Sequence, residues 1–480
     1  MSTLKRFFQD TIIYGFATVV PRLMNFILVP LHVTALSTVG YSVNTTFYVW
    51  AAFFNVILTY GMETAFFRYF SQSEKKNLVF STAFISLTVT TVIFFLVVFL
   101  FRDQLIGLVD LNPDYFNMLL GILALDTLVV VPFAYLRASN RPLKFTAIKI
   151  FNIVLVVLVN FYFLWLIPKH PSIIPDFVLN NYSETDKVQY IFLANLLASG
   201  ATFLILLPYF FKTSIAFSTK IFKQMWKYGW PVMVAGIAFV INEMLDKILL
   251  KEMVSDEIMG AYAACYKLAI FMTIFVQAFR LGAEPFFFNQ AKQENAKQIY
   301  ANILNYFVIL GSLIFIVMVV FLDLFKMLIV PNPDYWVTIS IVPVILLANL
   351  FLGIYHNLSV WYKLTDRTKL GMYISIIGAI ITIGLNLWLI PMIGFMASAY
   401  TTLAAYGTMM LVSYYFGRKY YPVPYNIKSI FLYLLISIGF AVISFNFFRE
   451  NYFVGTAFVV LFLMFVFINE RKDFRKIINH

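Results

Sequence analysis

Long apolar segments follow one another along the chain, with short polar connections between them. Each segment holds about 20 or more mostly apolar residues, which is the length that a helix needs to cross the hydrocarbon core of a membrane. The segments are apolar on most faces, without the alternation of a half-exposed strand. The pattern predicts about fourteen membrane-spanning helices. They cover residues 11–35, 41–67, 79–101, 115–136, 145–168, 188–211, 228–250, 258–289, 300–322, 335–362, 371–390, 393–416, 429–447 and 451–468.

Composition supports this reading. Of the 480 residues, 61% are hydrophobic and 12% are charged, whereas a soluble domain is roughly 45–50% apolar and about 25% charged. An aromatic share of 19% also excludes a disordered chain. The sequence therefore predicts an all-α polytopic membrane protein.

The basic residues give the orientation. With the N-terminus in the cytoplasm, the loops place 24 of the 35 Lys and Arg residues on the cytoplasmic side and six on the outer side. Cytoplasmic loops of membrane proteins carry such an excess, so both termini are expected in the cytoplasm. The same distribution accounts for the net charge of +12, and no nucleic-acid partner is expected.

The two halves of the chain share motifs at an offset of about 220 residues. Asn-Pro-Asp-Tyr stands at 112–115 and 332–335, and Trp-Leu-Ile-Pro stands at 165–168 and 388–391. Gly-Met-Glu at 61–63 matches Gly-Ala-Glu at 282–284. We expect helices 1–6 to form one repeat and helices 7–12 a second.

The repeat divides the chain into an N-terminal lobe over 1–220, a C-terminal lobe over 221–420, and helices 13–14 with a cytoplasmic tail over 421–480. Because six is an even number of helices, the repeats are parallel, and a pseudo-twofold axis along the membrane normal should relate them. Alternating-access transporters are built in this way, with the substrate site between the repeats near mid-membrane. A duplication without a transport role is the alternative.

Ionisable residues within the expected spans are candidates for function, because each costs about 2.5–3.5 kcal/mol at a helix centre. At helical spacing the polar positions of helices 1, 2, 7 and 8 form one stripe on each helix, which predicts a polar cavity between them. The candidates for substrate binding are Arg22, Asn25, Lys247, Lys267, Gln277 and Arg280. The candidates for ion coupling or gating are Glu63, Asp126, Glu243, Asp246 and Glu284.

Structural roles stand beside several of these. Glu243 with Lys247, and Arg280 with Glu284, are four residues apart and could neutralise each other. Lys267 lies off the helix-8 stripe and could be a helix contact.

Asp126 could bind a coupling ion or be a buried hydrogen-bonding group, and the second reading is favoured. Glu63 and Glu284 could be gate or structural residues in equal measure. Lys149, outside the candidate set, is expected to extend to the membrane surface.

Motifs of other chemistries are absent from the sequence. It holds no phosphate-binding loop of the type G-x-x-x-x-G-K-[ST] and no G-x-S-x-G turn. The four histidines are scattered and there is one cysteine, Cys265, so no metal-ligand spacing arises. We expect no catalytic residues, no metal and no cofactor, while coupling to H⁺ or Na⁺ stays open.

Three stretches carry a resemblance to a known family: 228–250 with Tyr-Gly-Trp-Pro at its start, 265–286, and 61–68. They resemble the bacterial polysaccharide flippases of the multidrug/oligosaccharidyl-lipid/polysaccharide (MOP) exporter superfamily. The resemblance implies a fourteen-helix fold with two lobes in the bacterial inner membrane. It implies that undecaprenyl-diphosphate-linked oligosaccharide moves from the cytoplasmic to the outer leaflet by alternating access, for O-antigen, capsule or exopolysaccharide synthesis.

The same resemblance implies contacts between the substrate diphosphate and basic residues of a central cavity. Arg22, Lys267 and Arg280 are the matching positions, and Lys247 is a weaker one. Membrane lipids and polysaccharide assembly proteins are the other expected partners.

Other functions remain open at this point. A cation-coupled multidrug antiporter would need unpaired acids in the cavity, and a flippase for the peptidoglycan precursor lipid II would be a closer cousin. A polysaccharide polymerase or ligase would carry a large outer loop with catalytic residues, and the longest outer loop, about 169–187, is too short for that.

The topology yields a test. Reporter fusions after residues 180 and 216 should report opposite sides of the membrane, because one expected span lies between them. Alkaline phosphatase and green fluorescent protein fusions measure this directly. Two fusions on the same side would overturn the assignment of helices 5–7.

Overall fold

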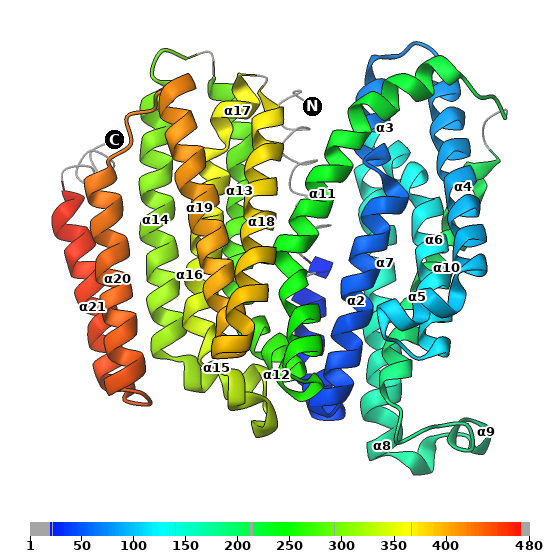
Figure 1. Cartoon of the computed structure of the whole chain (residues 1–480), viewed down its shortest axis with the longest axis horizontal. Coiled ribbons are helices and arrows are strands. Elements are labelled where there is room, and N and C mark those ends of the chain that lie inside the picture. The colour runs from blue at the N-terminus through cyan, green and yellow to red at the C-terminus, as the bar shows by residue number, and fades with distance from the viewer. Residues whose placement is uncertain are drawn as a thin grey trace. The chain divides into compact units, whose positions relative to one another are not determined.

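The computed structural model describes residues 20–21, 23–139, 141–211, 215–291, 293–365 and 367–471. Arg22 lies outside these ranges, and the side chain of Glu284 is outside the described part as well. Within the described ranges the regular elements are all helices (Figure 1). The chain divides into two compact units, Met1–Ala263 and Ala264–His480, so the expected boundary at residue 220 falls inside unit 1. The lobes as drawn from the sequence stay predictions.

Unit 1 begins with an apolar helix, Leu23–Ala35. It continues with α2 (Thr38–Thr59), α3 (Met62–Gln72), α4 (Lys76–Leu100), α5 (Arg102–Val109), α6 (Pro113–Ala138), α7 (Pro142–Phe161), the π-helical turn η1 (Tyr162–Leu166), α8 (Ile167–Lys169), η2 (Pro171–Ile173), α9 (Asp176–Leu179), α10 (Val188–Phe210) and α11 (Thr219–Met253). Helix α12 (Asp256–Tyr266) begins in unit 1 and ends in unit 2.

Unit 2 continues that helix through a short 3₁₀ turn. Its elements are η3 (Lys267–Ala269), α13 (Ile270–Gln290), α14 (Ala296–Val320), α15 (Leu322–Ile329), η4 (Pro333–Thr338), α16 (Ile341–Leu358), α17 (Val360–Leu364), α18 (Thr368–Ile393), α19 (Met396–Tyr420), α20 (Ile427–Phe447) and α21 (Tyr452–Asn469).

The all-α polytopic fold is confirmed. In the described part of the chain, ten helices are long and apolar enough to cross a membrane. Helices α2, α11 and α19 are of spanning length but are not among those ten. All three carry more polar side chains, as expected where a helix faces protein instead of lipid. The count of fourteen spans stays a prediction.

The repeat found in the sequence is visible in the local structure. Helices α4 and α5 recur as α14 and α15, each 220 residues later and with equal lengths of 25 and 8 residues. The next element starts with an asparagine cap in both repeats: Asn112 accepts from the backbone N–H of Asp114 at 2.9 Å, and Asn332 from that of Asp334 at 3.0 Å. A side-chain oxygen in this position satisfies an otherwise unpaired N–H.

Helices α11 and α12 pack tightly on α2 and α3 through glycines. Gly61, at φ +72°, turns the chain from α2 into α3, and a Cβ there would lie 2.4 Å from the carbonyl oxygen of Gly229. A Cβ on Gly260 of α12 would lie 1.9 Å from the carbonyl oxygen of Thr38. Only hydrogen on the Cα permits such backbone contacts.

The C-terminal hairpin α20–α21 is fastened to the rest of unit 2 at both ends. At one end Arg449 donates to both carboxylate oxygens of Asp323, at 3.0 and 3.1 Å, and Lys326 binds the same carboxylate. At the other end Glu470 accepts from Asn305 of α14 at 2.9 Å and from Tyr433 at 2.5 Å. Helix α14 packs against both helices of the hairpin.

The glycine contacts predict a stability difference. Gly260→Ala should lower the thermal unfolding midpoint, because its methyl group would meet backbone that cannot move aside. Gly200→Ala in α10 is the matched control, since a Cβ there meets nothing within 4 Å. It should keep or raise the midpoint, because alanine favours helix over glycine. Equal midpoints for the two purified variants would contradict the close approach.

The Asp323 carboxylate of α15, which binds Arg449 of the hairpin, predicts that stability depends on pH. Burial alone would raise the pKa of Asp323, but the hydrogen bonds from Arg449 and Lys326 outweigh it and hold the pKa below its usual range. A lowered pKa in the folded state means stability that is present above the ordinary value of about 3.9 and is lost as the pH falls through the folded value. The difference in unfolding midpoint between the native chain and Arg449→Ala should therefore narrow below about pH 4. A difference that stays constant down to pH 2 would contradict this.

Candidate functional site

A polar cavity of about 450 Å³ lies within unit 1. Five helices that face one another, α2, α3, α6, α7 and α10, provide its walls. Its lining residues are Asn55, Thr59, Glu63, Asp126, Val129, Val130, Phe133, Phe145, Lys149, Asn152, Asn195, Ser199 and Thr202. Such a polar space between spanning helices is a place where a solute or an ion can leave water without entering hydrocarbon.

One acid and one base face each other in this cavity. Asp126 of α6 has Ser199 of α10 and Lys149 of α7 as its electrostatic neighbours. The ammonium of Lys149 lies 4.4 Å from the centre of the Phe133 ring. Both side chains line the cavity, so the expectation that Lys149 extends to the membrane surface is wrong. Lys149 lies about two turns into α7, and its ammonium points at Phe133 of α6 within the cavity.

Glu63, which also lines the cavity, belongs to an ion pair. Glu63 of α3 accepts from Arg137 at 2.8 Å, and the two side chains are 50% and 43% exposed. Pairs this open contribute about 0–1 kcal/mol. Such a contact can be made and broken at little cost, which suits a gate, but it suits a surface contact equally well. Both readings of Glu63 stay open.

Amide and hydroxyl groups complete the walls. Asn152 donates to Thr202 at 3.0 Å, and Asn195 donates to the Tyr48 hydroxyl at 2.5 Å. Asn55 and Thr59, which the sequence places on the polar stripe of helix 2 with Glu63, line the cavity together with it. The polar face of α2 thus meets polar faces of α7 and α10.

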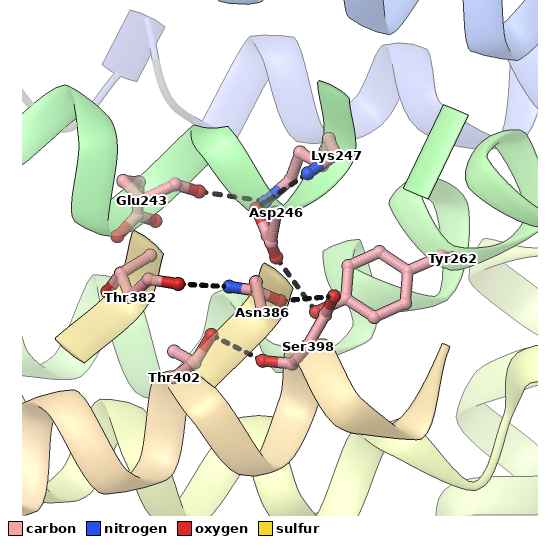
Figure 2. A network of polar contacts seen from close by, with 8 residues as sticks. All are labelled: Glu243, Asp246, Lys247, Tyr262, Thr382, Asn386, Ser398 and Thr402. Atoms are coloured by element: carbon pink, nitrogen blue, oxygen red, sulfur yellow. Dashed lines mark hydrogen bonds and ion pairs between the residues drawn. The ribbon is translucent and has the colours of Figure 1, made fainter. Parts of the chain in front are cut away.

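A buried charge network lies at the α11–α12 end of unit 1 (Figure 2). Lys247 donates to the Asp246 carboxylate at 2.9 Å and to the backbone carbonyl of Glu243 at 2.8 Å. The Tyr262 hydroxyl donates to the other oxygen of Asp246 at 2.9 Å. Asp246 is 2% exposed and Lys247 8%. Each charge therefore has a partner, which is the condition for burying it.

The neighbouring helix ends are also joined by charge. Lys251 at the end of α11 pairs with Asp110, which ends α5 in the left-handed region at φ 51°. Ser42 of α2 donates to Asp256 at the start of α12, at 2.5 Å. These contacts hold the turn between α11 and α12 to the first helices of unit 1.

In unit 2, basic groups gather around a small cavity of about 10 Å³. Arg280 of α13, His356 of α16 and Lys363 of α17 line it, with Asn357 beside them. Nearby on α13, the buried side-chain oxygen of Gln277 has no hydrogen-bond partner within the described part. Arg280 and Lys363 are the permanent positive charges of this cluster, and the cavity itself has room for about one water molecule.

Hydroxyls and an amide form a further buried chain in unit 2 (Figure 2). Ser398 of α19 donates to Asn386 of α18 at 2.8 Å, and Asn386 donates to the Thr382 carbonyl at 2.8 Å. Thr402 donates back to the carbonyl of Ser398 at 2.9 Å. These bonds join α18 to α19 and leave no ionisable group among them.

The structure brings two groups of the candidates from the sequence together. Glu63 and Asp126 share the unit 1 cavity, and Glu243, Asp246 and Lys247 share the network of Figure 2. The others stand apart. Arg280 lines the small cavity of unit 2, Lys267 is exposed in η3, and Asn25 is exposed on Leu23–Ala35. Arg22 and the side chain of Glu284 lie outside the described residues. The functional role of every candidate stays a prediction.

Sequence reasoning missed residues of both cavities. Lys149 and Asn152 are three residues apart on α7, and Asn195, Ser199 and Thr202 follow at steps of four and three on α10. This spacing is a polar stripe of the same kind as those on helices 1, 2, 7 and 8, so the signal was present. His356 and Lys363 carried no such signal, because they meet Arg280 only through the packing of α13 against α16 and α17.

Two family models match the chain. One, described as polysaccharide biosynthesis protein, matches residues 7–288, and the other, described as MatE, matches residues 231–388. No curated protein matches the sequence.

Solved structures share the fold. The lipid II flippase MurJ in an inward closed conformation is 16% identical, with a TM-score of 0.72 over 96% of this chain and 99% of that one. An inward-facing multidrug resistance MATE transporter of the MOP superfamily is 11% identical, with a TM-score of 0.66 over 88% and 99%. A MOP superfamily transporter from Pyrococcus furiosus, described as having a binding pocket of reversed polarity, is 13% identical, with a TM-score of 0.58 over 86% and 95%.

The charge network predicts that substitutions of its members lower the free energy of unfolding by different amounts. Asp246→Ala should lower the free energy of unfolding by about 3–5 kcal/mol, because it leaves the Lys247 ammonium buried without its carboxylate. Tyr262→Phe removes one hydrogen bond and should cost about 1–3 kcal/mol. The double variant Asp246→Leu/Lys247→Met should recover most of the loss, because it removes both charges. Denaturant unfolding of the purified variants measures the series, and a double variant less stable than Asp246→Ala would contradict it.

Proposed function

The chain belongs to the polysaccharide biosynthesis protein family, and on this premise we propose that it flips a lipid-linked oligosaccharide across the membrane. The substrate of the proposal is undecaprenyl-diphosphate-linked oligosaccharide. It moves from the cytoplasmic to the outer leaflet of the bacterial inner membrane, by alternating access between the two lobes. The product serves the assembly of O-antigen, capsule or exopolysaccharide outside the cytoplasm.

The observation that carries this proposal is the polar cavity of unit 1. A diphosphate with sugars attached does not cross hydrocarbon unaided, because burying an isolated charge there costs tens of kcal/mol. A cavity of about 450 Å³ lowers that barrier, because amides, hydroxyls, two acids and one lysine line it beside four apolar side chains. Amides and hydroxyls are also the groups that exchange hydrogen bonds with sugar hydroxyls, so the chemistry of the walls suits the head group.

Basic residues would meet the diphosphate. We propose Arg22, Lys267 and Arg280 for this contact, because a guanidinium donates two parallel bonds to phosphate oxygens and an ammonium offers a point charge. Lys267 and Arg280 are exposed in unit 2 and thus open to a ligand. Lys247 is the weaker candidate, since Asp246 and the Glu243 carbonyl already hold its ammonium.

We further propose that protons, not sodium ions, drive the cycle through Asp126. A sodium ion beside this carboxylate would meet the positive charge of Lys149 in the same cavity. A proton on the carboxylate avoids this conflict, because it removes charge where a metal ion would add it. Proton uptake at one face of the membrane and release at the other would then shift the equilibrium between the two states of the alternating-access cycle.

The test is export of polysaccharide in a host that lacks its own flippase. The native chain should restore surface polysaccharide, and Asp126→Asn should reduce it at least tenfold at equal abundance in the membrane. Asp103→Asn is the matched control, because this acid is exposed on α5 and does not line the cavity. Restored export with Asp126→Asn would overturn the role of Asp126. Absence of export by the native chain would overturn the function.

A second assay separates the driving ions. Proteoliposomes loaded with a fluorescent undecaprenyl-diphosphate oligosaccharide report movement between leaflets. An imposed pH gradient should accelerate the native chain and leave Asp126→Asn unchanged, whereas a sodium gradient should have no effect on either. Acceleration by sodium alone would contradict proton coupling. Extrusion of a cationic dye without movement of the oligosaccharide would favour a drug antiporter.

A further inference from the structure

Unit 1 carries a second large hollow that the proposed function does not use. It is an apolar groove of about 670 Å³ between α4, α6 and α10. Its lining residues are Ser81, Phe84, Ile85, Thr88, Val89, Leu128, Phe203, Phe210, Phe211 and Ile215. From Ser81 to Val89 it follows α4 for about 12 Å, at 1.5 Å per residue. The lining has two hydroxyl side chains and no amide or charged one, so it suits hydrocarbon.

The groove opens on the face of unit 1 that a membrane would cover. Val89 is 49% exposed, and α4 continues beyond it with exposed apolar side chains such as Val92 and Leu96. Phe211 and Ile215 at the other end of the groove are 82% and 92% exposed. Apolar surface of this extent on spanning helices faces lipid tails, and a lipid chain can therefore enter the groove sideways.

Positive charge borders one end of the groove. Helix α4 begins directly after Lys75, with Lys76 as its first residue, about one and a half turns before Ser81. The chain after Ile215 is fixed against the same turn of α4: Ala216 N–H donates to Ser81 at 2.9 Å and Ser218 N–H to Thr82 at 3.1 Å. Helix α11 follows at once with Lys220. All three lysines are exposed, and the Lys76 ammonium lies 5.6 Å from the centre of the Phe70 ring of α3. Three exposed cations thus stand in the chain near one end of the apolar groove.

We propose that this groove binds an anionic phospholipid, with one acyl chain in the groove and its phosphate at Lys75, Lys76 and Lys220. Basic pockets between spanning helices at a membrane surface recognise lipid head groups by this charge. The oligosaccharide-linked substrate is the poorer occupant, because the lining offers sugars only the hydroxyls of Ser81 and Thr88, and Ser81 already accepts from the Ala216 N–H. The proposal does not depend on what the polar cavity transports.

The site also has a defined place in the chain. Segment 215–218, which lies at this end of the groove, joins the last helix of the first repeat to α11. A lipid bound beneath it would stabilise this connection in one position. Binding should therefore raise the thermal unfolding midpoint in a lipid-dependent manner.

Photolabelling tests the proposal. The full chain is reconstituted in phosphatidylcholine vesicles that contain a small share of phosphatidylglycerol with a photoactivatable acyl chain. After irradiation, mass spectrometry of peptides should find the label concentrated on residues 81–89 of α4 and on residues 203–211, which cover the end of α10 and the residue after it. Unlabelled phosphatidylglycerol should compete at least fivefold better than phosphatidylcholine.

Matched variants locate the effect. Val89→Trp fills the groove and should reduce labelling at least fivefold, whereas Val92→Trp, an exposed valine of the same helix outside the groove, should not. Lys75→Gln/Lys76→Gln/Lys220→Gln should abolish the preference for phosphatidylglycerol. Lys144→Gln/Lys369→Gln/Lys428→Gln, three exposed lysines of other helices, should preserve it.

Three outcomes would overturn the proposal. Labelling spread evenly along α4 would show only the lipid that surrounds any membrane protein. Equal competition by both phospholipids would show that the three lysines do not select an anionic head group. Competition by an undecaprenyl-diphosphate lipid but not by phosphatidylglycerol would assign the groove to the substrate tail.

Discussion

Hydrocarbon does not solvate charge, and this one constraint orders the polar side chains of the protein. An ionisable group among spanning helices needs a partner or a wet cavity, and the described residues show both solutions. Asp246 has Lys247 and Tyr262 within hydrogen-bond distance and is closed off from solvent. Asp126 and Lys149 share a cavity large enough for many water molecules. The first arrangement is suited to holding helices together, and the second to exchanging protons and solutes.

Because only surfaces that face lipid must be apolar, helices that pack against protein can carry more polar side chains than a typical membrane span. Helices α2 and α11 pack against each other in unit 1 and need not satisfy lipid along their whole surface. Directly after α2, Gly61 meets Gly229 of α11, backbone against backbone. Such close approach is typical of helix packing in membranes, where small residues replace the hydrophobic effect as the source of association. Polar stripes and small residues thus occur on the same helices because these helices pack against protein and not against lipid.

Much of the fold could be predicted from the sequence, because spanning length and apolar composition are local properties. The helices and the repeat at about 220 residues could be read directly, and the cap at Asn112 recurs at Asn332 as the shared motif suggests. The polar cavity was harder. Asn55, Thr59 and Glu63 could be placed on one stripe, whereas the partner of Asp126 depends on how α6 faces α7. Helical periodicity gives the face of one helix but not the neighbour opposite it, and Lys149 was misplaced for that reason.

The hairpin α20–α21 gives the two copies of the repeat different surroundings. Asp103 on α5 and Asp323 on α15 occupy equivalent places 220 residues apart, yet the first is exposed and the second is 3% exposed beneath Arg449. The duplicated acid therefore serves as a solvated surface charge in one repeat and as an attachment point in the other. A transporter assembled from two equal halves needs some feature that makes them unequal if they are to move differently. The appended hairpin is attached to one copy of the repeat through Asp323, and the other copy carries the equivalent acid, Asp103, without this attachment.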